Sequence, residues 1–358
     1  MLRGVAVLLV FCYHSRGALL VSRFGWVGVD LFFVLSGFLV SGLLFSEYRV
    51  LGKVRPGVFL ARRGFKIYPQ FYLLLFVTLV AAYASRTPVS ISHIAAELFF
   101  FQNYAVGLWS HTWSLGVEEQ FYLALTLALV LLARRGGPNP FRCVPSSVAV
   151  IAAGVLMLRV LTWWLGGPIS LYRSVAPAHL RVDTLLCGVF ISYAYTFEKE
   201  RLAAWARRWR SWLAPLSIAL LAPITFMRRE DPFMVTVGFS MAACSFALLL
   251  INVLHPEKPA VPGRGFRIIA ALGRISYAFY LWHGPVISWT EQMVTLPAWL
   301  EFILTFAVSW LIAALTTALI EQPLLALRNR WFPACRSAAQ ADPRPEQRPI
   351  ACPDPLSA

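Results

Sequence analysis

The segment from Gly25 to Gly42 is apolar along nearly its whole length, yet it carries the carboxylate of Asp30 close to its start. An apolar stretch of roughly this length matches the thickness of a lipid bilayer and predicts a membrane-spanning helix. A carboxylate inside such a helix is costly in hydrocarbon, which makes it a candidate functional group. The segment therefore predicts a membrane protein with polar chemistry inside it.

The rest of the chain follows the same pattern, since hydrophobic residues make up 58% of its 358 residues and charged residues 14%. That is more apolar surface than one soluble core buries. Windows of bilayer length predict an all-α integral membrane protein with about ten transmembrane helices. The expected spans are residues 2–21, 25–46, 65–84, 115–133, 147–165, 182–198, 212–227, 233–254, 268–290 and 299–320.

The first expected span lacks a small-residue cleavage site, so we interpret it as a retained helix rather than a signal peptide. Its abrupt start at Met1 fits either a helix that begins at the membrane surface or a start codon further upstream. We expect a transmembrane domain over residues 1–325. Residues 326–358 are rich in Pro, Ala and charge, which predicts a disordered cytoplasmic tail.

Most of the 32 Lys and Arg residues fall in alternate loops between the expected spans. Positive charge gathers on the cytoplasmic side of membrane proteins, so both termini are expected to face the cytoplasm. Topology and attraction to anionic membrane lipid account for most of the net charge of +15. No motif for nucleic acid is present, and nucleic acid is not an expected partner.

The six cysteines have no paired spacing, so neither a disulfide framework nor a Cys-rich metal site is expected. The spacings of zinc proteases, hydrolase elbows and P-loops do not occur either, and no metal is expected. No internal repeat is evident, which argues against the inverted-repeat transporter folds.

Arg3 and His14 are eleven residues apart, which places them on one face of a helix and about 16 Å from each other along it. Asp30 begins the next expected span across a short loop and should lie at a depth similar to that of His14. A histidine and a carboxylate at one depth are typical of a general base with an orienting acid. The alternative is a histidine bonded to a backbone carbonyl group within the bundle.

The stretch from His111 to Tyr122 brings two adjacent acids, Glu118 and Glu119, into the fourth span. Adjacent helical residues point about 100° apart, so at most one of them faces a shared cavity. The alternative role for the pair is capping at the membrane interface, where Trp109 and Trp113 would be aromatic anchors.

Arg62, Arg63 and Lys66 lie within little more than one helical turn at the start of the third span. Such a cluster either only sets the orientation in the membrane or binds the phosphates of a substrate. Glu321 ends the last span, and Arg181 and Asp183 at the start of the sixth span can pair with each other. The further candidate residues are Ser36, His111, Trp113, Glu119, Arg181, Asp183, Tyr277 and His283, the last beside the helix-kinking Pro285.

Several of these segments together resemble the acyltransferase 3 family of integral-membrane acyltransferases. The resemblance rests on Arg3 and His14, Gly28–Phe38 (GVDLFFVLSGF), Arg62-Arg63-Gly-Phe-Lys66, Trp113–Glu118 (WSLGVE) and Ile275–His283 (ISYAFYLWH). Lys66 departs from the arginine of the family at the third basic position, which removes bidentate geometry there.

The resemblance implies a ten-helix bundle that transfers an acyl group, usually acetyl from acetyl-CoA, to a hydroxyl group of a surface polysaccharide, lipid-linked glycan or glycosylated metabolite. It also implies that Arg3 and His14 are needed for activity. On this basis acyl-CoA is expected to bind through its phosphates at Arg62, Arg63 and Lys66, with Arg3 steadying the donor. His14, oriented by Asp30 or Glu118, is then the expected base.

Two other functions remain open from the residues alone. One is a proton-coupled glycan or lipid transporter or flippase, with a proton relay through His14, Asp30 and Glu118. The other is a structural membrane subunit. The preference for Arg over Lys suits a GC-rich bacterial genome and hence a bacterial cytoplasmic membrane. The pattern identifies neither the acceptor nor the oligomeric state.

Overall fold

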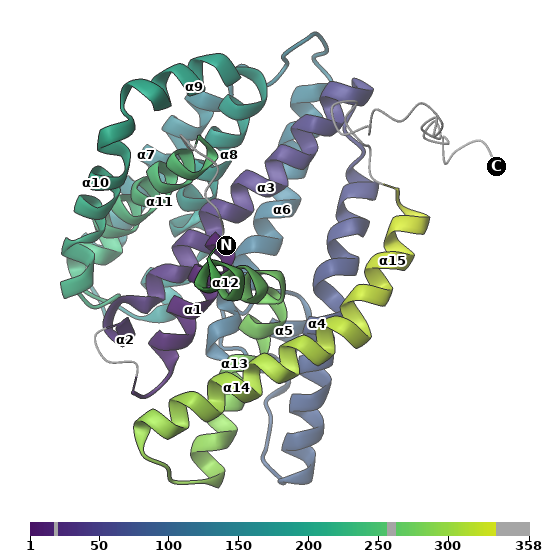
Figure 1. Ribbon diagram of the computed structural model, residues 1–358, viewed down its shortest axis with the longest axis vertical. Coiled ribbons are helices and arrows are strands. Elements are labelled where there is room, and N and C mark those ends of the chain that lie inside the picture. The colour runs from purple at the N-terminus through teal and green to yellow at the C-terminus, as the bar shows by residue number, and fades with distance from the viewer. Residues whose placement is uncertain (18–20, 256–262, 334–358) are drawn as a thin grey trace.

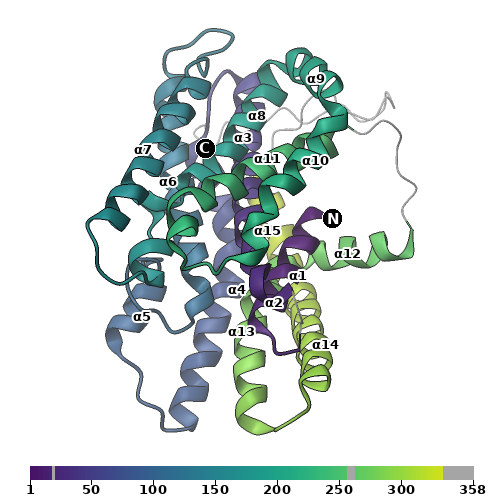
Figure 2. The same cartoon turned by 90° about the vertical axis from the view of Figure 1, so that its left-hand side faces the viewer.

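The computed structural model describes residues 1–17, 21–255 and 263–333, and these residues form helices and loops with no β-strand among them. Most of the helices follow the long axis of the molecule (Figures 1 and 2). The all-α fold expected from the sequence is therefore confirmed for the described residues. The helices are α1 (Leu2–His14), α2 (Val21–Phe24), α3 (Gly28–Leu51), α4 (Pro56–Ala84), α5 (Ile91–Leu98), α6 (Trp113–Ala133), α7 (Val144–Trp164), α8 (Val182–Phe197), α9 (Lys199–Arg208), α10 (Arg210–Leu221), α11 (Phe239–Leu254), α12 (Arg264–Arg274), α13 (Ser276–Met293), α14 (Ala298–Thr316) and α15 (Gln322–Trp331), with short 3₁₀ or π turns η1 (Gly25–Val27), η2 (Ser110–Thr112), η3 (Leu171–Val175), η4 (Ala178–Leu180), η5 (Pro223–Phe226), η6 (Met234–Gly238) and η7 (Thr317–Glu321).

Six helical stretches among the described residues are long and apolar enough to cross a membrane. They are Val21–Leu51, Pro56–Ala84, Ser110–Ala133, Val144–Trp164, Met234–Leu254 and Ala298–Trp331, with shorter apolar helices at Leu2–His14, Val182–Phe197 and Arg210–Phe226. Large apolar side chains such as Phe76, Leu127 and Leu319 are exposed on these stretches, as lipid contact requires. The chain is a multi-pass membrane protein by these criteria, but the expected count of about ten spans is not confirmed.

Several boundaries differ from the expected ones. The first helix ends at His14 rather than at residue 21, and the third expected span begins earlier, because α4 starts at Pro56 and carries the basic residues within it. The segment expected as residues 268–290 is broken at Ile275 into α12 and α13.

The expected tail falls in two parts. Its first residues continue α15 as far as Trp331, so they are helical. Residues 334–358, the remainder of that prediction, lie outside the described residues.

Small residues let the helices that carry the polar groups approach closely. A Cβ atom on Gly37 of α3 would lie 1.9 Å from the Leu185 carbonyl oxygen of α8, and one on Gly188 would lie 2.1 Å from that of Val34. Close backbone approach at small residues is a common means of helix association in membranes. These glycines therefore set the separation of α3 from α8 and the place of Asp30 against α8.

The bundle has two ends, which we call the basic end and the opposite end. The basic end holds α9 and the turn between α3 and α4, and the opposite end holds the end of α4 and the turn between α13 and α14 (Figures 1 and 2). Helices α1 and α13 run in the same direction, since Arg3 contacts Ser276 and, farther along both helices, His14 contacts His283.

Candidate functional site

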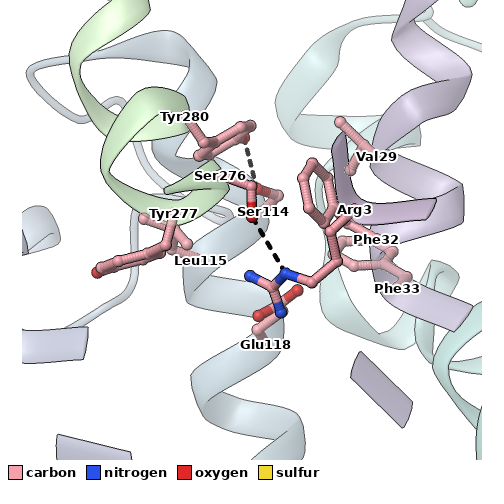
Figure 3. Close-up of a pocket in the computed structure, with 10 residues that line it drawn as sticks. All are labelled: Arg3, Val29, Phe32, Phe33, Ser114, Leu115, Glu118, Ser276, Tyr277 and Tyr280. Atoms are coloured by element: carbon pink, nitrogen blue, oxygen red, sulfur yellow. Dashed lines mark hydrogen bonds between the residues drawn. The ribbon is translucent and has the colours of Figure 1, made fainter. Parts of the chain in front are cut away.

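Arg3, in the first turn of α1, reaches into a hollow between α1, α3, α6 and α13, which we call the Arg3 chamber. Its Nε donates a hydrogen bond of 3.1 Å to Ser276 Oγ, and its guanidinium group points toward Glu118 (Figure 3). The chamber encloses about 360 Å³, including the space at its mouth. It is lined by Arg3, Val29, Phe32, Phe33, Ser114, Leu115, Glu118, Ser276, Tyr277 and Tyr280.

Glu118 is held in place by two hydroxyl groups. Ser36 Oγ donates to Glu118 Oε1 at 2.9 Å, and Tyr122 Oη donates to Oε2 at 2.5 Å. The two donors fix the carboxyl group at the wall of the chamber. The structure thus brings together the candidates Arg3, Ser36 and Glu118.

Glu119 has a different partner from Glu118, but both line one further hollow, so the expectation that at most one of them faces a shared cavity was wrong. Glu119 Oε2 accepts a hydrogen bond of 3.1 Å from Tyr68 Oη of α4. Tyr277 links α13 to the same helix, because its hydroxyl group donates to the Ile67 carbonyl oxygen at 2.8 Å.

The three basic residues of α4 have different partners. Lys66 forms an ion pair with Glu321, which the π turn η7 directs toward it. The Arg63 guanidinium lies 4.4 Å from the centroid of the Tyr122 ring. Arg62, nearer the surface, donates to the carbonyl oxygen of Phe332. The three basic side chains therefore have separate surroundings and do not form one uniform phosphate-binding site.

These residues line a hollow of about 750 Å³, including the space at its mouth, at the basic end of the bundle. We call it the basic hollow. Its lining comprises Leu43, Ser46, Glu47, Arg55, Val58, Phe59, Arg62, Arg63, Lys66, Arg328 and Pro333.

A third hollow, here called the junction, lies between the other two. It shares Arg63 and Lys66 with the basic hollow, and it shares Arg3 and Glu118 with the Arg3 chamber. The three hollows thus form one row from the basic end to Tyr280 of the chamber. A long, thin, anionic ligand suits such a row better than a compact one.

Three histidines meet at the far end of this row. The ring of His283 lies 5.1 Å from that of His14 and 4.9 Å from that of His111, measured between centroids. Tyr280 belongs to both regions, because it lines the chamber and its ring lies 5.6 Å from the rings of His111 and His283. Within the described residues no cluster of His, Cys, Asp and Glu side chains has the arrangement of a metal site.

The expected pair of His14 with Asp30 is not formed, and this prediction was wrong. Asp30 Oδ1 instead accepts a hydrogen bond of 2.5 Å from Arg181 Nη2, and both side chains are buried. Glu118 does not orient His14 either, because Ser36 and Tyr122 hold it at the chamber. Similar depth along two helices does not fix the direction in which their side chains point.

The sequence suggested that Arg181 and Asp183 pair with each other, but each has another partner. Asp183 pairs with Arg159 of α7, a residue that the sequence did not single out as functional. Arg181 also lies 3.7 Å from the centroid of the Phe239 ring and 5.7 Å from that of Trp113. Four buried charges and their aromatic neighbours thus tie α3, α7, α8 and α11 together.

Sequence reasoning also missed Ser114, Ser276 and Tyr280. Ser114 Oγ and Tyr280 Oη are 2.6 Å apart, and Ser276 receives the Arg3 hydrogen bond. All three lie within the segments that carry the resemblance, so membership of those segments was the available signal. Hydroxyl residues on apolar helices are too common to single out otherwise.

Glu97 of α5 holds the loop that leads into α6. Its Oε1 accepts hydrogen bonds from Thr112 Oγ1 at 2.8 Å, Leu108 N at 3.1 Å and Trp109 N at 3.3 Å, while Oε2 has no partner within the described part of the chain. Burial raises the pKa of Glu97 from its ordinary 4.5 to about 6. A neutral carboxyl group fits these contacts, because only one oxygen is needed as an acceptor.

The contacts and the raised pKa of Glu97 predict different results for two substitutions of this residue. A raised pKa means that the carboxyl group stabilises the fold below pH 4.5 and loses that effect, about 2 kcal/mol, as pH rises through about 6. Glu97→Gln keeps the acceptor and should abolish this pH dependence. Glu97→Ala leaves the N–H groups of Leu108 and Trp109 unpaired, whereas Thr112 Oγ1 can still donate to the Trp109 carbonyl oxygen, and it should destabilise the protein by about 1–3 kcal/mol. Unfolding of the detergent-solubilised protein at pH 4.5 and 7 measures both effects, and a loss of stability in Glu97→Gln equal to that in Glu97→Ala would contradict this account.

Comparison with known proteins gives three findings. A family sequence profile described as "Acyltransferase domain" (acyltransferase 3) matches residues 1–318. The chain is 24% identical to the O-acetyltransferase OatA of Staphylococcus aureus (strain NCTC 8325 / PS 47), an alignment that covers 93% of this chain and 57% of that protein. It is 26% identical to a protein described as a putative O-acetyltransferase of S. aureus (strain MSSA476), which covers 90% of this chain and 56% of that one. The chain thus spans little more than half the length of these curated relatives. No solved structure matches.

Proposed function

Because the chain belongs to the acyltransferase 3 family, we propose that it is a membrane-bound O-acyltransferase that moves an acetyl group from acetyl-CoA to a hydroxyl group of a carbohydrate-containing acceptor. The acceptor classes are a surface polysaccharide, a lipid-linked glycan and a glycosylated metabolite. We place the protein in the cytoplasmic membrane of a bacterium, with the basic end and both termini on the cytoplasmic side. The distribution of Lys and Arg supports this orientation.

The row of three hollows is the observation that carries the proposal. In this scheme the phosphates of the donor bind at the basic hollow, where Arg62 and Arg328 line the mouth. The pantetheine arm passes the junction beside Arg63 and Lys66, and Arg3 steadies it. The thioester then lies beside Tyr280, close to the histidine cluster. The separation of Arg3 from His14, about 16 Å along α1, is of the order of the length of that arm.

The proposed chemistry uses Nε2 of His14, the ring nitrogen that does not contact the Val10 carbonyl oxygen. His14 takes the proton of the acceptor hydroxyl group as its oxygen attacks the thioester carbonyl carbon. The bond from that carbon to sulfur breaks, and CoA leaves as a thiol after it receives the proton. Direct transfer is the simpler scheme, and an acyl-histidine intermediate is its variant.

The alternative function is a proton-coupled glycan or lipid transporter. Its relay would run through His14, Asp30 and Glu118, but Asp30 pairs with Arg181 and Glu118 with Ser36 and Tyr122. This separation favours the acyltransferase.

Mass spectrometry of surface glycans and glycosylated small molecules tests the proposal, in cells with the gene, without it and with the gene restored. We expect a discrete acyl mass to disappear with the gene and return with it. That mass identifies both the acyl group and the acceptor. Unchanged acylation together with a changed amount or location of a glycan would favour the transporter.

The donor scheme predicts a specific effect of Arg62→Ala. Loss of a charged hydrogen bond to phosphate should raise the KM for acetyl-CoA by about tenfold to 100-fold with little change in kcat. The KM for acetylpantetheine, which lacks the nucleotide phosphates, should not change. Arg201→Ala is the matched control, since this exposed arginine at the basic end forms an ion pair with Glu198, three residues before it, and lines none of the three hollows. An equal rise in KM for both donors would show that Arg62 does not bind the phosphates.

A further inference from the structure

The mechanism leaves His283 without a role, although it is the most deeply placed histidine of the cluster. Its side chain is completely buried in the middle of α13. His283 Nε2 lies 3.3 Å from His14 Nδ1, whereas the candidate carboxylates Asp30 and Glu118 have other partners. His283 is therefore a side chain that can orient His14 and stabilise its protonated ring.

The protonation of His283 follows from its other contact. His283 Nδ1 lies 2.6 Å from the Tyr280 carbonyl oxygen, and a carbonyl oxygen can only accept a hydrogen bond. Nδ1 therefore carries the proton, and in the neutral ring Nε2 is the acceptor. This unprotonated Nε2 faces His14.

The state of His14 follows in turn. Its Nδ1 lies 3.0 Å from the Val10 carbonyl oxygen as well as 3.3 Å from His283 Nε2, and both of these atoms are acceptors. Nδ1 of His14 must therefore carry the proton. The lone pair of the neutral ring is then on Nε2, which is the nitrogen that a general base needs.

Pro285 and Gly284 keep the third ring in place. Pro285 has no backbone N–H, so the Leu281 carbonyl oxygen lacks its helical donor and accepts a hydrogen bond of 3.2 Å from His111 Nε2. A Cβ atom on Gly284 would lie 2.6 Å from the His111 ring, so only glycine leaves room for it. His111 is thus held against His283, with 4.9 Å between the two ring centroids.

We propose that His283 is the positioning residue of the transfer reaction. Together with the Val10 carbonyl oxygen it holds His14 in the tautomer with the proton on Nδ1, and it aims Nε2 at the acceptor hydroxyl group. When His14 takes the proton of that hydroxyl group on Nε2, His283 Nε2 remains bonded to the Nδ1 proton and stabilises the imidazolium ring. This inference rests on the proposed function of His14 as the base, and it assigns to His283 the task that an aspartate has in other histidine-based sites.

Two substitutions at position 283 separate its two hydrogen bonds. Glutamine carries a polar atom where histidine has Nε2, so His283→Gln keeps an acceptor for His14. Asparagine carries one where histidine has Nδ1, so His283→Asn keeps the bond to the Tyr280 carbonyl oxygen and removes the one to His14. We expect His283→Asn to lower kcat by about 100-fold or more with an unchanged KM for acetyl-CoA, and His283→Gln to retain most of kcat.

The state of His14 can be measured without activity. In the ¹⁵N-labelled protein in lipid bilayers, solid-state NMR should show His14 protonated at Nδ1 in the wild type, and a displaced Nδ1 resonance in His283→Asn, where only the Val10 carbonyl oxygen still accepts from that nitrogen. A wild-type His14 protonated at Nε2, or a wild-type kcat in a folded His283→Asn, would overturn the inference. Either result leaves the proposed function intact if the wild type transfers acyl groups, whereas absence of transfer by the wild type would refute that function whatever the tautomer.

Discussion

His14→Ala should lower the rate of acyl transfer by about 10²–10⁴-fold, because this is the usual contribution of a positioned general base. The side chain is only partly buried, and its Nδ1 bonds the Val10 carbonyl oxygen of its own helix and His283. Removing it therefore costs little packing, so the loss should appear in kcat and not in the amount of folded protein. The measurement is release of CoA thiol with the purified protein and acceptor in vesicles.

His255→Ala is a matched control for this experiment. His255 lies at the end of α11, and its Nδ1 lies 3.2 Å from the carbonyl oxygen four residues earlier, as in His14. The control therefore removes the same local contact outside the three hollows, and its activity should match that of the wild type. Normal transfer by a folded His14→Ala would contradict the role of His14 as base. Acyl groups trapped on His14 after rapid quenching would identify the covalent variant of the mechanism.

The sequence predicted which segments carry the chemistry more successfully than which side chains meet. Arg3 and His14 do lie on one helix, and the segments containing Ser36, Glu118, Tyr277 and His283 do converge on it. Hydrophobic length sets the depth of a residue in a helix, and periodicity places residues of one helix on a common face. Both are local properties, so a single sequence contains them.

The partners of the charged groups could not be predicted in the same way. Asp30 meets Arg181, 151 positions away, and Lys66 meets Glu321, 255 positions away. These pairs depend on how helices from distant parts of the chain pack and rotate against each other. The close contact of Gly37 with the Leu185 backbone turns Asp30 toward α8 and away from His14, and no local pattern contains that contact.

The predicted helix boundaries were wrong for a related reason. The basic residues of α4 lowered the local hydropathy, so the sequence placed the start of the span at residue 65, whereas the helix begins at Pro56. Arg62, Arg63 and Lys66 face the hollows and not lipid, so they do not interrupt the helix. Hydropathy read along the chain cannot distinguish a charged residue that ends a span from one that lines a cavity within it.

Asp30→Leu should destabilise the protein by about 3–5 kcal/mol, because it leaves Arg181 buried without its partner. Adding Arg181→Met should restore most of that stability, since replacement of a whole buried ion pair by apolar side chains is often neutral. Several atoms of the pair, among them Asp30 Oδ2 and Arg181 Nε, already lack hydrogen-bond partners within the described residues, which lowers the cost of removing both. Arg159 and Asp183 remain paired in the double variant. The free energy of unfolding in mixed micelles measures all three proteins.

The same double variant tests whether Asp30 takes part in transfer or only holds α3 against α8. If Asp30 oriented His14, a protein with Asp30→Leu and Arg181→Met would be stable but inactive. We expect it to be stable and to retain kcat, because His283 and not Asp30 contacts His14. A double variant as unstable as Asp30→Leu alone would mean that the cost comes from lost hydrogen bonding or packing at Asp30 and not from the unpaired charge of Arg181. Stability and kcat together therefore separate a carboxylate that holds α3 against α8 from one that takes part in transfer, a distinction that its position in the sequence does not make.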